Sequence, residues 1–256
     1  AWKDDSNLIY ARAFDSSFEA RGDNFVLQSS TDRQEHVSLE AIPDGGFLAA
    51  WQERDPATST YDIMARRFTK TLEAQADAFM VNDHTTNNQK MPSLALLSNN
   101  QLFVAWQSKG QDTTSYESIY ARQYTIGEAN SRVIYSTHNN SDNSQCQVCL
   151  HQTEFADKDQ CKCLEDHYVS ELCTFESFGA QQVVTTSASG AFDVFAADID
   201  GDGDMDLASA SFADKKIAWY ENTDGQGTFG PQQVVAVAVN LMPVSVFAAD
   251  IDGDGD

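Results

Sequence analysis

The segment VFAADIDGDGD at residues 194–204 returns unchanged at residues 246–256, 52 residues further along the chain. A second string, FGAQQVV at 178–184, returns as FGPQQVV at 229–235, 51 residues on. Strings that return at nearly the same spacing indicate a structural repeat of about 50 residues. We therefore interpret the chain as a repeat protein and place its local motifs within the repeat.

The first half of the chain carries its own repeat. The dipeptide AW occurs at residues 1–2, 50–51 and 105–106, at spacings of 49 and 55. A second string follows each AW: IYARAF at 9–14, IMARRF at 63–68 and IYARQY at 119–124. The two halves differ in sequence but share nearly the same period.

Each repeat contains four short runs that are rich in β-branched and aromatic residues and bounded by turn residues, as is typical of strands. The runs are HVSLEAI, GGFLAAWQ, YDIMARRF and DAFMVN in the first half, and FDVFAAD, DLASASF, KIAWYEN and FGPQQVV in the second. Four strands in about 50 residues are typical of a propeller blade. We predict an all-β, β-propeller-like array of four-stranded antiparallel blades, with an unclosed array or a sandwich as the alternative.

Aspartates occupy alternate positions of the segment DIDGDGDMD: Asp198, Asp200, Asp202, Asp204 and Asp206. Five carboxylates in one tight loop repel one another unless a cation lies among them. Ca²⁺ takes 6–8 oxygen ligands from flexible loops, whereas Mg²⁺ prefers few protein ligands and several waters. We therefore predict a calcium site in which Asp204 offers its main-chain carbonyl and the other four offer side chains.

The calcium loop has further features that separate it from an EF-hand. Gly201 and Gly203 allow the backbone to wrap around an ion. Ser209 stands where an EF-hand has its twelfth-position Glu, and strand patterns flank the loop in place of helices. The second copy of the loop carries the corresponding aspartates, Asp250, Asp252, Asp254 and Asp256. A solvated acidic turn is the alternative.

The strings FGPQQVV, VFAADIDGDGDMDLASAS and KIAWYEN resemble FG-GAP/VCBS-type repeats, the calcium-loop blades of integrin-like β-propellers, over residues 178–256. This resemblance implies the calcium ligands Asp198, Asp200, Asp202 and Asp206 in the first loop, and Asp250, Asp252 and Asp254 in the second. The first half, residues 1–140, resembles the AWQ…IYARRF repeats of large bacterial and algal surface proteins, and we predict no calcium there. Such families are secreted, adhesive or structural, and some members are lectins or parts of enzymes.

Residues 141–177 interrupt the repeats, and we predict an insertion on a loop between blades. The insertion holds all five cysteines: Cys146, Cys149, Cys161, Cys163 and Cys173. Its C-x-C-x9-C end resembles the last half of an EGF-like module, a resemblance that implies a Cys163–Cys173 disulfide. The odd number leaves one thiol free or paired elsewhere, and the remaining pairing stays open. A zinc site formed by some of these cysteines with His151 or His167 is the alternative.

The disulfides and calcium loops favour an extracellular, secreted or cell-surface location. Asn139 begins an Asn-Asn-Ser sequon beside the insertion and is a candidate glycosylation site. Lys and Arg number 16 against 39 Asp and Glu, so the net charge of −23 argues against nucleic-acid partners. The longest uncharged apolar stretch, residues 234–249, is too short to cross a bilayer.

No nucleophile or nucleotide-binding motif is present, so we predict a non-enzymatic, calcium-stabilised structural or adhesive protein. It is expected to associate with itself or with neighbouring repeats, because the chain opens at the end of a second strand and closes after a first strand, so a neighbour can complete the blade and build a filament. A carbohydrate-binding propeller and a propeller domain of a secreted enzyme are the alternatives. For the four tryptophans we predict core packing, with sugar stacking as the alternative.

Overall fold

The computed structural model describes residues 2–3, 8–15, 17–28, 32–97, 101–112, 116–126, 177–238 and 241–249. These residues form strands and turns with no helix among them, so the all-β prediction is confirmed. A search of the described residues finds no helix long and apolar enough to span a membrane.

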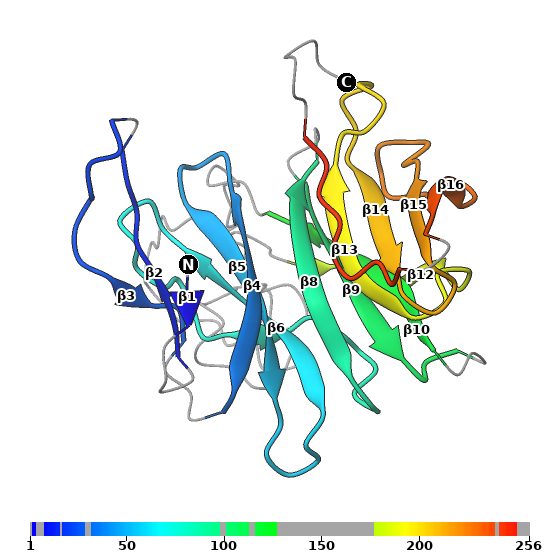
Figure 1. Ribbon diagram of the computed structural model, residues 1–256. Helices are drawn as coiled ribbons and strands as arrows, with labels where there is room; N and C mark the ends of the chain where they lie inside the picture. The colour runs from blue at the N-terminus through cyan, green and yellow to red at the C-terminus, as the bar shows by residue number, and fades with distance from the viewer. Residues whose placement is uncertain are drawn as a thin grey trace, which may run out of the picture.

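The strands form four antiparallel sheets (Figure 1). The first has the order β1-β2-β3: β1 Trp2–Lys3, β2 Ile9–Ala11 and β3 Phe25–Val26. The second has the order β4-β5-β6-β7: β4 Gln34–Ala41, β5 Phe47–Arg54, β6 Tyr61–Phe68 and β7 Phe79–Met80. The third has the order β11-β10-β9-β8, with β12 also paired to β10: β8 Gln89–Leu96, β9 Gln101–Lys109, β10 Glu117–Thr125, β11 Ser177–Phe178 and β12 Gln182–Thr185. The fourth has the order β13-β14-β15-β16: β13 Ala191–Ala197, β14 Asp206–Ser211, β15 Lys216–Tyr220 and β16 Gln233–Val237.

The sequence repeat of the first half corresponds to a repeated strand register. In each of the first three sheets, the tryptophan of the AW string lies opposite the second residue of the following string. The pairs are Trp2 with Tyr10, Trp51 with Met64 and Trp106 with Tyr120. The two strings are therefore equivalent neighbouring strands of successive sheets, as their spacing predicts.

The last predicted strand lies further along the chain than expected. We expected it at residues 229–235, whereas β16 runs from Gln233 to Val237. Phe229 instead forms an isolated bridge with Asn222 at the preceding turn. Pro231 follows, and it has no N–H to donate to a neighbouring strand, so continuous pairing begins only after it.

Successive sheets pack against one another through separate hydrophobic cores. The first and second sheets enclose Leu27, Trp51 and Phe68 among others. The second and third enclose a core that includes Trp106, and the third and fourth enclose a core that includes Leu207. The core role predicted for Trp51 and Trp106 is confirmed, because both side chains are fully buried.

Arginines of the repeated string connect the second and third sheets to the sheet before each of them. Arg66 donates through Nη1 to the main-chain oxygen of Leu27, 3.3 Å away in the first sheet. Arg122 donates through Nη1 to the main-chain oxygen of Val81, 2.7 Å away beside β7. Both arginines stand three residues after an isoleucine of their strand. We call the position three residues after this isoleucine the bridging position, because the side chain there connects two sheets.

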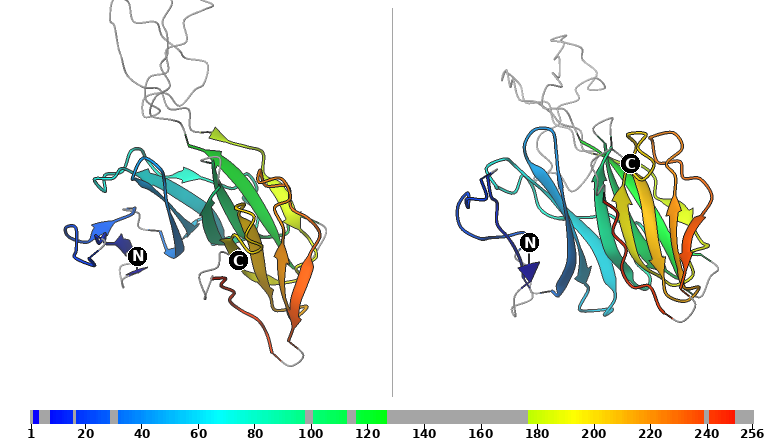
Figure 2. Two further views of the ribbon diagram at one scale, coloured as in Figure 1. Left: turned by 90° about the horizontal axis from the view of Figure 1, so that it is seen from above. Right: turned by 45° about the horizontal axis from the view of Figure 1, so that its top comes forward.

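The sheets follow one another in chain order, from β1–β3 at one end to β13–β16 at the other (Figures 1 and 2). None of the core clusters in the described residues joins the first sheet to the last. The segment 241–249 lies beside β13, where the rings of Phe247 and Phe195 are 4.8 Å apart. Closure into a propeller stays a prediction.

Candidate metal centre

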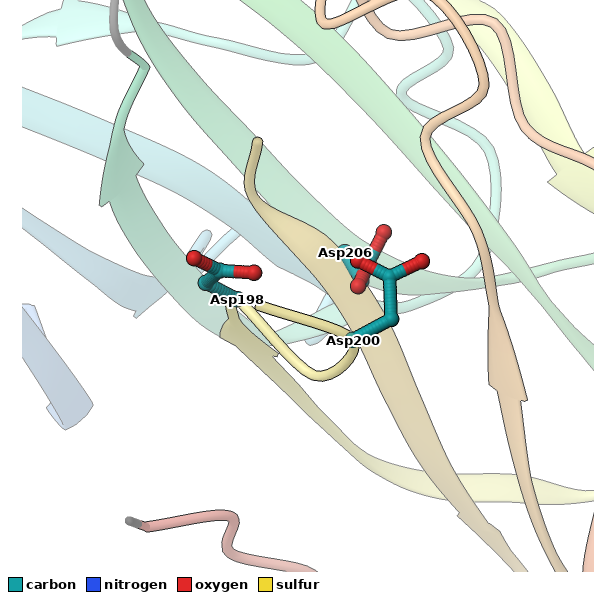
Figure 3. Close-up of side chains that lie close together, drawn as sticks. All are labelled: Asp198, Asp200 and Asp206. Carbon is teal, nitrogen blue, oxygen red and sulfur yellow. The ribbon is translucent and has the colours of Figure 1, made fainter. Parts of the chain in front are cut away.

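The aspartate loop joins β13 to β14, as its position between two strand patterns predicts. Figure 3 shows Asp198, just after β13, Asp200 within the turn and Asp206 at the start of β14. One carboxylate oxygen from each lies within 4.8 Å of the others. These three aspartates form the one group of three or more His, Cys, Asp or Glu side chains in the described residues that is close enough to hold a metal ion.

Main-chain hydrogen bonds shape the loop around these carboxylates. Asp198 accepts from the N–H groups of Gly201 (2.9 Å) and Gly203 (3.0 Å), so its side chain spans the turn. Both glycines have positive φ angles, 77° and 92°, which only glycine adopts without strain. Both glycines therefore allow the tight turn, and their predicted role in wrapping the backbone around an ion stays a prediction.

Asp206 is the buried member of the group, with 1% of its surface exposed. Its two carboxylate oxygens accept from the N–H of Ile199 at 3.0 Å and of Asn222 at 2.8 Å. Burial raises the pKa of the Asp206 carboxyl above its ordinary value. Its two main-chain hydrogen bonds oppose this rise, and the negative charges of Asp200 and Asp202 add to it. A cation among these carboxylates would offset both the burial and the repulsion.

The loop is linked through Asp206 to the turn between β15 and β16. Asn222, which donates its N–H to Asp206, accepts from the N–H of Gly227 at 2.8 Å. The main-chain oxygen of Gly227 in turn accepts from Gln182 of β12 at 2.8 Å, and that of Gln226 accepts from Gln123 of β10. A continuous series of hydrogen bonds therefore runs from the aspartate loop to the neighbouring third sheet.

The donor set fits a calcium ion. Ca²⁺ binds carboxylate oxygens at about 2.3–2.6 Å, so two oxygens on opposite sides of one ion lie about 5 Å apart. The separation of up to 4.8 Å among the three carboxylate oxygens falls within that limit. Asp198, Asp200 and Asp206 would hold the ion, which would supply positive charge and fix the turn.

The other two aspartates of the loop lie outside this group of three. Asp202 accepts from the N–H of Asp204 at 2.9 Å. The negative charge of Asp202 contributes to the raised pKa of Asp206. The carboxylate of Asp204 lies where a side chain at Gly225 would clash with it, so Gly225 leaves room for that carboxylate. The loop thus brings together three of the four predicted side-chain ligands.

The remaining predicted site residues lie outside the described residues. They are Asp250, Asp252, Asp254 and Asp256 of the second loop, Asn139, and the cysteines Cys146, Cys149, Cys161, Cys163 and Cys173. Their roles stay predictions.

The comparison with protein families agrees with the loop geometry. Residues 198–256 match the family model of the FG-GAP-like repeat. The match begins at Asp198, the first aspartate of the loop, and covers most of the region, 178–256, for which we expected it. No curated protein matches the chain. The resemblance of the first half to surface-protein repeats has no support from these comparisons and stays a prediction.

Two features of the structure, one at the site and one between the sheets, were not found by sequence reasoning. Asn222 holds the loop to the adjacent turn, and the bridging arginines connect the sheets. The arginines had a visible signal, because an Ala-Arg pair recurs in all three copies of the first-half string. Asn222 had none, because nothing in the sequence shows which turn faces the aspartate loop.

Proposed function

We propose that this protein is a calcium-stabilised, non-enzymatic β-repeat protein with a structural or adhesive role outside the cell. The observation that carries the proposal is the meeting of Asp198, Asp200 and Asp206 at one turn, inside the stretch that matches the FG-GAP-like repeat. The alternation of acidic residues with glycines in that turn suits a cation better than a catalytic acid–base pair.

Calcium at this turn would stabilise more than one hairpin. The turn joins β13 to β14, and its hydrogen bonds continue through Asn222 and Gly227 to Gln182 of the third sheet. An ion bound there would therefore support the junction between the last two sheets. We propose on this basis that calcium holds the repeats in a fixed arrangement, as a structural protein requires.

The proposed location follows from the same chemistry. Extracellular calcium modules work at dissociation constants of about 10⁻⁴–10⁻³ M, which suits a largely surface-exposed loop. The predicted disulfides at 141–177 and the predicted glycan at Asn139 belong to the same compartment. We propose that the sheets continue into a propeller or a longer array through neighbouring repeats or further copies of the chain.

Thermal unfolding in calcium and in EGTA tests this proposal. At ten times its dissociation constant, one bound ion stabilises the folded protein by about 1.4 kcal/mol. For a chain of this size, we expect the melting temperature to rise by about 3–6 °C in calcium. Magnesium should give a smaller rise, because it binds few protein ligands.

Two variants locate the effect. Asp200→Asn removes one carboxylate of the group and should abolish the calcium-dependent rise. The control, Asp224→Asn, changes an aspartate of the neighbouring turn outside the group and should keep the rise. Equal melting temperatures in calcium and EGTA for the unaltered protein would contradict the proposal.

A further inference from the structure

The bridging position recurs in all four sheets, but only three of its members reach a preceding sheet. Arg66 and Arg122 donate to main-chain oxygens of the sheet before their own. Tyr220 stands at the same position of β15, three residues after Ile217, and its side chain is hydrogen-bonded to that of Thr185 in the third sheet. A side chain at the bridging position therefore reaches the preceding sheet three times, twice as an arginine on a main-chain oxygen and once as a tyrosine.

The partner of each bridging side chain also has a constant place in its sheet. In each sheet the partner lies on, or directly after, the strand that pairs with the strand of the repeated string. There it stands opposite the isoleucine of that string. The pairs are Leu27 with Ile9, Val81 with Ile63 and Thr185 with Ile119. The fourth sheet has the same arrangement, with Ala236 of β16 opposite Ile217.

An aromatic residue two positions after the bridging position completes each junction of the first half. Phe68 lies in the core with the first sheet, where its ring is 5.9 Å from that of Phe25. Tyr124 lies in the core with the second sheet, where its ring is 5.7 Å from that of Phe79. Each junction thus combines a polar bridge with an aromatic contact to the preceding outer strand.

The first sheet carries the same two groups, and no second sheet of the described residues packs against them. Arg12 stands three residues after Ile9, and Phe14 two residues later. Arg12 is exposed and lies over the Phe14 ring, and no hydrogen bond of its side chain is found within the described part of the chain. Phe14 is 53% exposed, whereas its counterpart Phe68 is 2% exposed.

The fourth sheet presents the complementary surface at the other end of the array (Figure 1). Ala236, opposite Ile217, is exposed, whereas its counterparts Leu27 and Val81 are fully buried beneath the next sheet. Val234 stands two residues before Ala236, as Phe25 stands before Leu27, and is 48% exposed. The first sheet therefore carries one half of a junction, Arg12 and Phe14, which we call the donor half. The fourth sheet carries the other half, Val234 and Ala236, which we call the acceptor half.

We propose that these two ends join between copies of this chain. Arg12 of one copy donates to the main-chain oxygen of Ala236 in a second copy, and Phe14 packs on Val234 of that copy. The occupant is a second copy because the contact repeats the arginine bridge and aromatic contact that this chain already forms twice between its own sheets. The contact is head-to-tail, so it extends into a filament or closes into a ring. This inference rests on the structural role proposed above and names the surface that serves it.

Sedimentation velocity of the full chain in calcium, over a series of protein concentrations, tests the inference. The unaltered protein should form species larger than a monomer as its concentration rises. The double variant Arg12→Ala/Phe14→Ser removes the donor half, and Val234→Lys places a cation on the acceptor half. Each variant alone should remain a monomer.

The decisive sample is an equal mixture of the two variants. Each still carries the half that the other lacks, so the mixture should give a dimer that grows no further. The control Arg21→Ala/Phe18→Ser removes an exposed cation and a ring that is 86% exposed on the connection between β2 and β3, and it should associate like the unaltered protein. Melting curves in calcium and EGTA on the same samples report the calcium effect separately from association.

Three results would overturn the inference. They are an unaltered protein that stays monomeric throughout the series, a donor-half variant that associates like the unaltered protein, and a mixture that shows no dimer.

Discussion

Replacing Trp106 with alanine is expected to lower the free energy of unfolding by about 3–5 kcal/mol, the usual cost of deleting a large buried aromatic side chain. Trp106 is fully buried in the core between the second and third sheets. Its indole N–H donates to Gln89, 3.2 Å away, and the truncation would leave that buried amide oxygen without this donor. Urea denaturation followed by circular dichroism measures the change.

Trp219 provides the matched control. It lies on β15 and is only partly buried, so Trp219→Ala should cost clearly less than Trp106→Ala. A Trp106→Ala protein that unfolds at the same urea concentration as the unaltered protein would show that the packing between sheets has been misassigned.

Asp206→Ala is expected to destabilise the protein by about 2–4 kcal/mol even in EGTA. The substitution removes the acceptor of two main-chain N–H groups, and a buried donor without a partner costs about 1–3 kcal/mol. The N–H of Asn222 is buried at its hydrogen bond to Asp206, and that of Ile199 is partly buried. Denaturation curves in EGTA isolate this structural effect from any effect of calcium.

Asp200→Asn is the matched comparison for Asp206→Ala. Asp200 is exposed, and its carboxylate accepts a hydrogen bond from the N–H of Asp202 at 3.3 Å on the surface. The Asp200 variant should therefore be at least as stable as the unaltered protein in EGTA, because one repelling charge is removed, and should lack the gain in calcium. Equal stability of Asp206→Ala and the unaltered protein in EGTA would rule out the structural role assigned to Asp206.

The strands and the aspartate loop could be predicted because the sequence repeats itself. A string that returns after about 50 residues fixes which runs are equivalent, and the strand register confirms it at Trp51 and Trp106. The loop could be placed because glycine readily adopts the positive φ angles that a tight turn requires, as Gly201 and Gly203 do. Both signals are local in the sequence.

The packing between sheets was harder to predict. Arg66 and Leu27 are 39 residues apart, and their hydrogen bond depends on how two sheets stack. The contact of Asp206 with Asn222 likewise depends on which turn faces the loop. A period in the sequence says that sheets repeat, but not which side chains meet where they pack.

The sequence pattern also does not predict which of the five aspartates lie close enough together to share an ion. Alternate spacing treats Asp202 like its neighbours, whereas the structure groups only Asp198, Asp200 and Asp206. Asp202 is instead bonded to the N–H of Asp204, two residues on. Hydrogen bonding within the turn decides which carboxylates face one another.

Isothermal titration of calcium into the metal-free protein tests the central claim most directly. The account predicts saturable binding that is lost or strongly weakened in Asp200→Asn and kept in Asp224→Asn. An absence of binding, or binding of equal strength in the unaltered protein and in Asp200→Asn, would contradict the assignment of Asp198, Asp200 and Asp206 as a calcium site.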